Sequence, residues 1–264
     1  MSRKRADKRL RAVRRAWRAL RRAPLGIRVG AAAAALLALA FAVNWGYQVA
    51  RKPTELFFPV SGVLAKTPRE TWRQYEAIFR AHATGAITPE FLAALAQVEA
   101  AGNPVARTYW RWRLTAQPFD VYRPASSAVG MYQITDATFR EASRYCIHDH
   151  AVAETGPWYD AGSCWFNRLY FRVVPSHAVE MTSAYLAHRV RQTLLRRHIA
   201  NATLRQKQDL AAVIHLCGAA AGDAFARRGF RVTAGERCGN HEVGRYVGRV
   251  TAMESLFIHL ARAG

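Results

Sequence analysis

The sequence predicts a mostly α-helical protein with one membrane-spanning helix near its N-terminus. Of its 264 residues, 51% are hydrophobic, a share too high for an intrinsically disordered chain. Apolar residues recur at helical spacing behind recognisable helix caps, whereas the alternation that is typical of strands is nearly absent. The chain is long enough to build a domain with a substantial core.

Positive charge is concentrated in residues 1–28. This leader holds twelve of the 39 Lys and Arg residues and one of the 18 acidic residues, so the rest of the chain has 27 basic and 17 acidic residues. A leader of this kind fits nucleic-acid binding or membrane topology with attraction to anionic lipid. We favour the membrane interpretation because an apolar run follows directly, whereas nucleic-acid binding would rest on charge alone.

The apolar run, residues 29–50, has about the 20 residues that a membrane-spanning helix needs. Trp45 and Tyr47 fall where an interfacial aromatic belt is expected, and the preceding charge predicts a cytoplasmic N-terminus. A cleaved signal peptide is the alternative, because residues 40–42 (AFA) fit a cleavage site, but the basic lead is long for one. Both interpretations export residues 51–264.

Four cysteines, all in the exported part, fit disulfides formed in an oxidising compartment, and three pairings are open. We predict the pairing in which each bond closes one local loop: Cys146 with Cys164, and Cys217 with Cys238. A metal site in the segment CIHDH, residues 146–150, is the competing interpretation, but no second ligand pair supports it. We expect neither a metal nor a cofactor.

The exported part reads as a tether over residues 51–66 followed by one domain over residues 67–264. Thr67 starts a helix, with Glu70 completing a capping box, and Thr88 starts a second helix that ends at the segment AGNP. Further helices are expected over residues 135–143, about 176–199, 204–218 and 241–262, and irregular structure over residues 105–129 and 146–175.

One carboxylate, Glu99, interrupts the apolar face of the second helix. Leu92, Leu95, Ala96 and Glu99 follow the i, i+3, i+4, i+7 spacing, which places Glu99 on the inward stripe. Burial disfavours a charged carboxylate, so this group would keep its proton and act as a general acid. The structural alternatives are that Glu99 is buried in a pair with an arginine, or that it lies at a helix end and reaches solvent.

A second segment gives Glu99 a context. The pair ALAQVEAAGNP (residues 94–104) and SSAVGMYQIT (residues 126–135) resembles the lysozyme-like domain of soluble lytic transglycosylases, in which a glutamate ends a helix and a Gly-Leu-Met-Gln-type segment follows. VIHLCGAA stands where that family has Ala-Tyr-Asn-Ala-Gly, and HEVGRYVGRV resembles its Glu-Thr-x-x-Tyr-Val. The resemblance covers about residues 67–260.

The resemblance implies a lysozyme-like helical fold that faces the periplasm from a bacterial inner membrane and cleaves peptidoglycan between N-acetylmuramic acid and N-acetylglucosamine. Glu99 would protonate the glycosidic oxygen and then take the proton of the muramic C6 hydroxyl, which gives a 1,6-anhydro product. That intramolecular hydroxyl replaces the second carboxylate of ordinary glycosidases. With the anchor, the resemblance suggests local wall opening for a secretion or conjugation apparatus.

Seven residues are candidates for binding the glycan: Ser126, Ser127, Met131, Tyr132, Gln133, His215 and Tyr246. Each also has a structural interpretation. The serines fit turns, Met131 fits a core, and Tyr132 and Gln133 fit a loop-to-helix junction. His215, in place of a family tyrosine, and Tyr246 are both candidates for hydrogen bonds to Glu99, and both also fit packing.

Other features leave the function open. Ala100 replaces the family's usual serine, and the stretch from Glu99 to Gly130 is about a dozen residues longer than usual. Asp136 fits a helix start better than a second carboxylate, and WRW at residues 110–112 fits sugar stacking, anionic-polymer binding or a surface-helix stripe. Two alternatives therefore stand: a non-catalytic peptidoglycan-binding or assembly protein, and a muramidase that uses water.

Overall fold

The computed structural model describes residues 18–57, 62–160 and 162–263. These residues form two compact units: a smaller unit that ends at Pro53 and also includes residues 112–123, and a larger unit of residues 54–111 and 124 onward. Most of the predicted basic leader, residues 1–17, lies outside the described residues.

The smaller unit is built on helix α2, Leu25–Arg51, which extends beyond the predicted span of residues 29–50 at both ends. At 1.5 Å per residue it is about 40 Å long, enough to cross the hydrocarbon core of a bilayer. Its apolar side chains face outward: Leu36, Leu37 and Leu39 are each at least 60% exposed. Helix α2 is thus long and apolar enough to cross a membrane.

A β-hairpin interrupts the stretch that the sequence predicted to be irregular, residues 105–129. Strand β1, Trp110–Trp112, pairs with strand β2, Tyr122–Pro124, and the short 3-10 helix η2, Pro118–Asp120, lies in the loop between them. The Trp112 ring stacks on the Tyr122 ring with centroids 4.5 Å apart. The interpretation of WRW as a surface-helix stripe is therefore wrong, because cross-strand stacking holds it extended.

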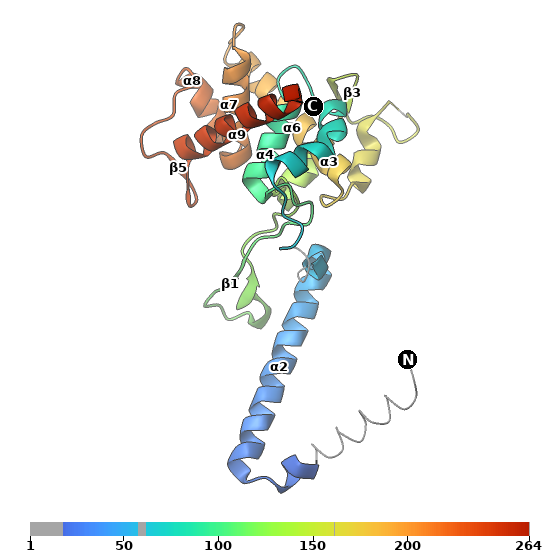
Figure 1. Ribbon diagram of the computed structural model, residues 1–264, viewed down its shortest axis with the longest axis vertical. Coiled ribbons are helices and arrows are strands. Elements are labelled where there is room, and N and C mark those ends of the chain that lie inside the picture. The colour runs from blue at the N-terminus through green and yellow to red at the C-terminus, as the bar shows by residue number, and fades with distance from the viewer. Residues whose placement is uncertain (1–17, 58–61, 161, 264) are drawn as a thin grey trace. The chain divides into compact units, whose positions relative to one another are not determined.

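The larger unit is mostly helical, as predicted (Figure 1). Every helix expected there is present within a few residues of its predicted bounds, and α8 was not predicted, because Gly218 separates it from α7 by one residue. The helices are α3 (Pro68–Ala81), α4 (Pro89–Ala100), α5 (Asp136–Ala142), α6 (Pro175–Arg196), α7 (Leu204–Cys217), α8 (Ala219–Arg227) and α9 (Val243–Ala263).

Two small hairpins and two disulfides brace the loops of this unit. The first hairpin joins β3 (Tyr145–His148) to β4 (Ala151–Glu154), within the region that was predicted to be a loop, and the second joins β5 (Arg237–Cys238) to β6 (His241–Glu242). The disulfides have the predicted pairing. They tie β3 to the 3-10 helix η3 (Cys164–Leu169) and the end of α7 to β5: Cys146–Cys164 and Cys217–Cys238. The disulfide leaves Cys146 without a thiolate to offer a metal.

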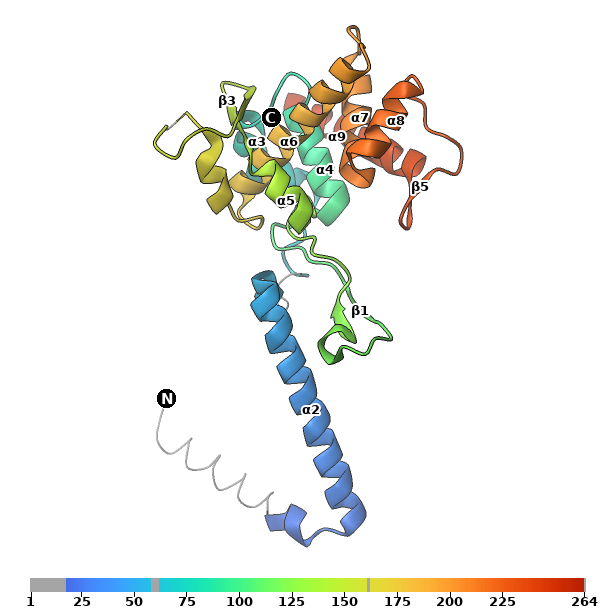
Figure 2. The same ribbon diagram turned by 180° about the vertical axis from the view of Figure 1, so that it is seen from behind.

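Helix α4 lies at the centre of the core. Its residues from Phe91 to Ala96 are at most 1% exposed, because the helix packs against both α3 and α9. Both views show α4 surrounded by α3, α6 and α9 (Figures 1 and 2). Thr88 caps its N-terminus by accepting a hydrogen bond from the Phe91 amide, which satisfies one of the free donors of the first turn.

The predicted tether, residues 51–66, is not wholly a linker. The 3-10 helix η1, Pro53–Phe57, buries the Glu55 side chain completely. Its Oε2 accepts hydrogen bonds from the Arg107 guanidinium at 3.2 Å and from the Trp110 indole nitrogen at 2.9 Å. A buried carboxylate is tolerated only with such partners, so these contacts attach η1 to the larger unit.

Replacing Cys217 and Cys238 together by serine is expected to lower the free energy of unfolding by about 3 kcal/mol, because an open loop of this length gains entropy in the unfolded chain. The two cysteines are 21 residues apart. Urea unfolding of the full chain in detergent would measure the change. An unaltered midpoint would contradict a stabilising role for this bond.

Candidate active site

Glu99 lies in the last turn of α4, where the buried helix reaches the surface. Its side chain is 18% exposed, whereas the residues one and two turns earlier are fully buried. Glu99 thus combines the predicted position on the inward stripe with the alternative of a helix end that reaches solvent. Glu99 sits at the boundary between core and solvent, a position from which a carboxyl can meet a ligand.

The backbone after Glu99 is held in a specific turn. Ala101 adopts the left-handed conformation, with φ 49°, and its amide donates back to the Gln97 carbonyl at 2.9 Å, which is the bond of an αL C-cap. A Cβ on Gly102 would lie 2.2 Å from the Thr71 hydroxyl oxygen. Glycine is required there because α3 approaches so closely, and this contact anchors the end of α4.

Tyr246, on α9, is the strongest partner of Glu99. Its hydroxyl donates a hydrogen bond to Glu99 Oε1 at 2.5 Å, and its residue is only 2% exposed. Burial raises the pKa of the Tyr246 phenol well above its usual value, and the adjacent Glu99 carboxylate raises it further. The phenol therefore stays a proton donor at physiological pH and orients the carboxyl group.

His215, near the end of α7, is the second partner. Its Nε2 lies 3.6 Å from the same oxygen, Glu99 Oε1, and forms an ion pair with the carboxylate when the imidazole is protonated. Both contacts fall on Oε1, and Oε2 has no partner within the described part of the chain. One carboxyl oxygen is thus held, and the other is free to exchange a proton with a ligand.

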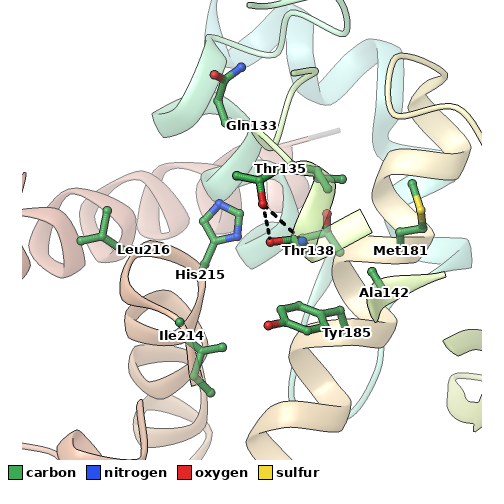
Figure 3. Close-up of a pocket in the computed structure, with 12 residues that line it drawn as sticks. Gln133, Thr135, Thr138, Ala142, Met181, Tyr185, Ile214, His215 and Leu216 are labelled. Carbon is green, nitrogen blue, oxygen red and sulfur yellow. Dashed lines mark hydrogen bonds between the residues drawn. The ribbon is translucent and has the colours of Figure 1, made fainter. Parts of the chain in front are cut away.

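A cavity of about 220 Å³ opens beside His215. It is walled by the start of α5, the middle of α6 and the end of α7, with Thr135, Thr138, Tyr185 and His215 among its lining residues (Figure 3). The His215 ring points toward the two threonines, which hydrogen-bond to each other at 3.0 Å. The Thr182 hydroxyl, also in the lining, is buried with no hydrogen-bond partner among the described residues.

Two of the predicted glycan-binding residues lie in the core. Met131 and Tyr132 have no exposed surface, and the Tyr132 hydroxyl donates to the Leu92 carbonyl on α4 at 3.2 Å. A side chain without exposed surface has no face to offer a sugar. Both residues instead belong to the core that surrounds α4.

Gln133 and Gly130 shape the turn that precedes α5. The Gln133 side-chain amide donates to the backbone carbonyls of Gly130, at 3.0 Å, and Ala106, at 3.3 Å, so it fastens the loop while it lines the cavity edge. A Cβ on Gly130, whose φ is 82°, would lie 2.3 Å from the Arg172 carbonyl oxygen. The segment around Gly130 therefore serves mainly to pack this turn, and one side of the segment borders the cavity.

The two candidate serines have turn-forming roles. Ser126 Oγ accepts a hydrogen bond from the Ala128 amide, and Ser127 Oγ accepts one from the Asp136 amide at 3.1 Å. Asp136 begins α5 and forms an ion pair with Arg172 at 2.7 Å, which agrees with its interpretation as a helix-start residue. These contacts do not direct either serine toward Glu99.

The comparison with protein families agrees with this geometry. Residues 76–203 match the family model described as a transglycosylase SLT domain. This segment belongs to the transglycosylase SLT family. None of the curated proteins matches the chain. The SLT match brings with it a lysozyme-like helical fold and an action on peptidoglycan, as the resemblance implied.

The SLT match includes Glu99 and the segment around Gly130, but it ends before both partners of Glu99. His215 and Tyr246 come from α7 and α9, which follow residue 203. The chain downstream of the match therefore completes the surroundings of the SLT carboxyl group. In the described part of the chain, no second carboxylate contacts Glu99.

Sequence reasoning missed two residues that organise the SLT domain. Arg172 donates to the backbone carbonyls of Ser127 and Ile134, which fixes the loop before α5, but a lone arginine in a loop carries no sequence signal. Glu180, on α6, is buried and accepts from the Tyr170 hydroxyl at 2.7 Å and the Ile147 amide at 3.1 Å. Both of its oxygens are engaged, so we assign it a structural role.

Replacing Gly130 by alanine is expected to destabilise the fold by roughly 1–3 kcal/mol, because the new Cβ would force the Arg172 carbonyl away and would strain the backbone. Gly85→Ala is the matched control, since its Cβ would meet open space. Urea unfolding of both variants and the parent in detergent would compare them. Equal stability of the two variants would contradict the close approach.

Proposed function

We propose that the chain is a membrane-anchored peptidoglycan lytic transglycosylase in which Glu99 is the only acid/base. The observation that supports this most is the arrangement at Glu99, where Tyr246 holds one carboxyl oxygen and no described residue holds the other. The family match supports the substrate class. A single carboxyl group suffices for this reaction because the attacking hydroxyl belongs to the substrate itself.

In the first step, Glu99 gives its proton to the glycosidic oxygen between N-acetylmuramic acid and N-acetylglucosamine. The bond from the anomeric carbon to that oxygen breaks, and the sugar develops oxocarbenium character. The carboxylate left on Glu99 keeps the hydrogen bond from Tyr246, a charge-assisted contact that stabilises the negative form. His215 favours the same form when it is protonated, because opposite charges at this distance attract.

In the second step, the Glu99 carboxylate takes the proton of the muramic C6 hydroxyl while that oxygen bonds to the anomeric carbon. The product is a 1,6-anhydro sugar, and Glu99 returns to its protonated state. The intramolecular hydroxyl has a high effective concentration, so no water-activating second carboxylate is needed. The absence of one at Glu99 within the described residues supports this route over muramidase chemistry.

We also propose that α2 remains attached as an anchor with its N-terminus in the cytoplasm. Cleavage after residues 40–42 would remove Phe41, whose ring contacts Trp112 and Tyr122 edge-on at 6.3 and 6.2 Å. Two side-chain amides of α2 also hydrogen-bond to the same segment. Contacts of this kind support a helix that stays part of the folded protein, and the basic leader supports the orientation.

Glu99→Gln is expected to lower the release of anhydromuropeptides from purified sacculi by about 100-fold or more, because the amide cannot donate or accept the catalytic proton. Glu90→Gln, in the first turn of the same helix, is the matched control and should retain activity. Mass analysis of the products from the full chain in detergent would measure both. Reducing ends in place of anhydro ends would instead identify a muramidase.

Tyr246→Phe is expected to reduce kcat by about 10-fold with little change in KM, since a hydrogen bond to a charged group contributes about 1.5 kcal/mol or more. The bond strengthens as Glu99 becomes negative, so its loss falls on the chemical step. Tyr109→Phe, at a residue 68% exposed, serves as control. A change in KM alone would contradict this role for the phenol.

A further inference from the structure

The segment of residues 112–123, here called the hairpin segment, packs along the last three turns of α2. Near its two ends Trp112 and Tyr122 meet the Phe41 ring, and at its loop Phe119 stacks on Tyr47 with centroids 4.5 Å apart. Arg51, ten residues after Phe41, lies 3.9 Å from the Asp120 carboxylate, so the contacts cover about 15 Å of the helix axis. The hairpin segment therefore lies alongside the part of α2 that includes the end of its apolar run.

Two polar side chains of α2 hydrogen-bond to the backbone of the hairpin segment. Asn44 Nδ2 donates to the Tyr122 carbonyl at 2.8 Å, and Gln48 Nε2 donates to the Phe119 carbonyl at 2.6 Å. Gln48 is only 5% exposed although it lies on a mostly exposed helix. In water these carbonyls would need no partner, whereas non-helical backbone at membrane depth must be satisfied by protein. The Asn44 and Gln48 amides supply the hydrogen-bond donors that a lipid environment lacks.

The outer side of the hairpin segment exposes large apolar side chains. Leu114 is fully exposed at 107%, and Trp112 is 65% exposed. They continue the exposed apolar surface of α2, where Phe41, Val43 and Trp45 are 43–50% exposed. Arg113, also exposed, suits contact with lipid phosphates beside the apolar residues. Aromatic rings, a leucine and an arginine together are typical of a membrane interface.

We propose that the hairpin segment inserts into the lipid interface beside α2, on the leaflet at the C-terminal end of that helix, with Leu114 and Trp112 in contact with lipid. The proposal rests on α2 as a membrane anchor and is independent of the reaction at Glu99. It assigns a role to the extra residues between Glu99 and Gly130: they form a second membrane contact. That contact binds a bilayer rather than a glycan.

A spin label tests the depth of the hairpin segment. All four native cysteines are in disulfides, so a nitroxide reacts with a single introduced cysteine in the full chain, reconstituted in phosphatidylcholine and phosphatidylglycerol vesicles. Leu114→Cys is the test variant. Leu37→Cys, in the middle of α2, is the bilayer reference, and Leu195→Cys, an exposed leucine of α6, is the water reference. Collision rates with oxygen and with a water-soluble nickel complex report the depth of each label.

The label at residue 114 is expected to collide often with oxygen and rarely with the nickel complex, as the label at residue 37 does. The label at residue 195 should show the opposite. A label at residue 114 that behaves as in water, while residue 37 reports lipid, would overturn the proposal and leave the anchor intact. If the labels at residues 37 and 114 both show the collision rates of a label in water, α2 is not a membrane anchor and this proposal is wrong as well. Immobilisation of a water-exposed label at residue 114 by soluble glycan fragments would overturn the proposal in favour of a sugar site. Muropeptide release is measured separately, so the catalytic proposal stands or falls on other data.

Discussion

The hydrogen bond from Tyr246 to Glu99 is the contact on which the site depends. It joins the end of α4, whose residues 91–96 are buried in the core, to α9 near the C-terminal end of the chain. Because Tyr246 is itself buried, its hydroxyl has a defined position, and the carboxyl group it holds is oriented rather than free to rotate. The rest of the larger unit can be understood as support for these two side chains.

That support comes from packing more than from polar residues at the surface. The left-handed turn at Ala101 and Gly102 ends α4 soon after Glu99, and Met131 and Tyr132 fill part of the core that surrounds the helix. Gly130 allows the loop before α5 to approach the Arg172 carbonyl. The segment that resembles a substrate-binding motif thus contributes mainly by shaping the turn, while His215 and the threonines line the adjacent cavity.

The smaller unit follows a different physical rule. In the larger unit apolar side chains avoid water by packing on one another, whereas α2 leaves them exposed along its length. Two amide side chains near its C-terminal end, Asn44 and Gln48, donate hydrogen bonds to carbonyls of residues 112–123. An apolar exterior, with loop carbonyls satisfied by protein amides, is the pattern expected of a helix that crosses a bilayer.

The sequence by itself determined the helical class, the bounds of most helices and the pairing of the cysteines, because caps, periodicity and local loop closure are encoded within short stretches. Its periodicity placed Glu99 on the inward face of a helix, and only the resemblance to a family made that carboxyl the one of interest. The sequence did not predict α8 or the hairpin at residues 110–124. Only the tertiary structure decided which side chains reach Glu99, since Tyr246 is 147 residues away in the chain, and which motif residues are enclosed. These outcomes depend on how α4, α7 and α9 pack together, and no local pattern encodes that packing.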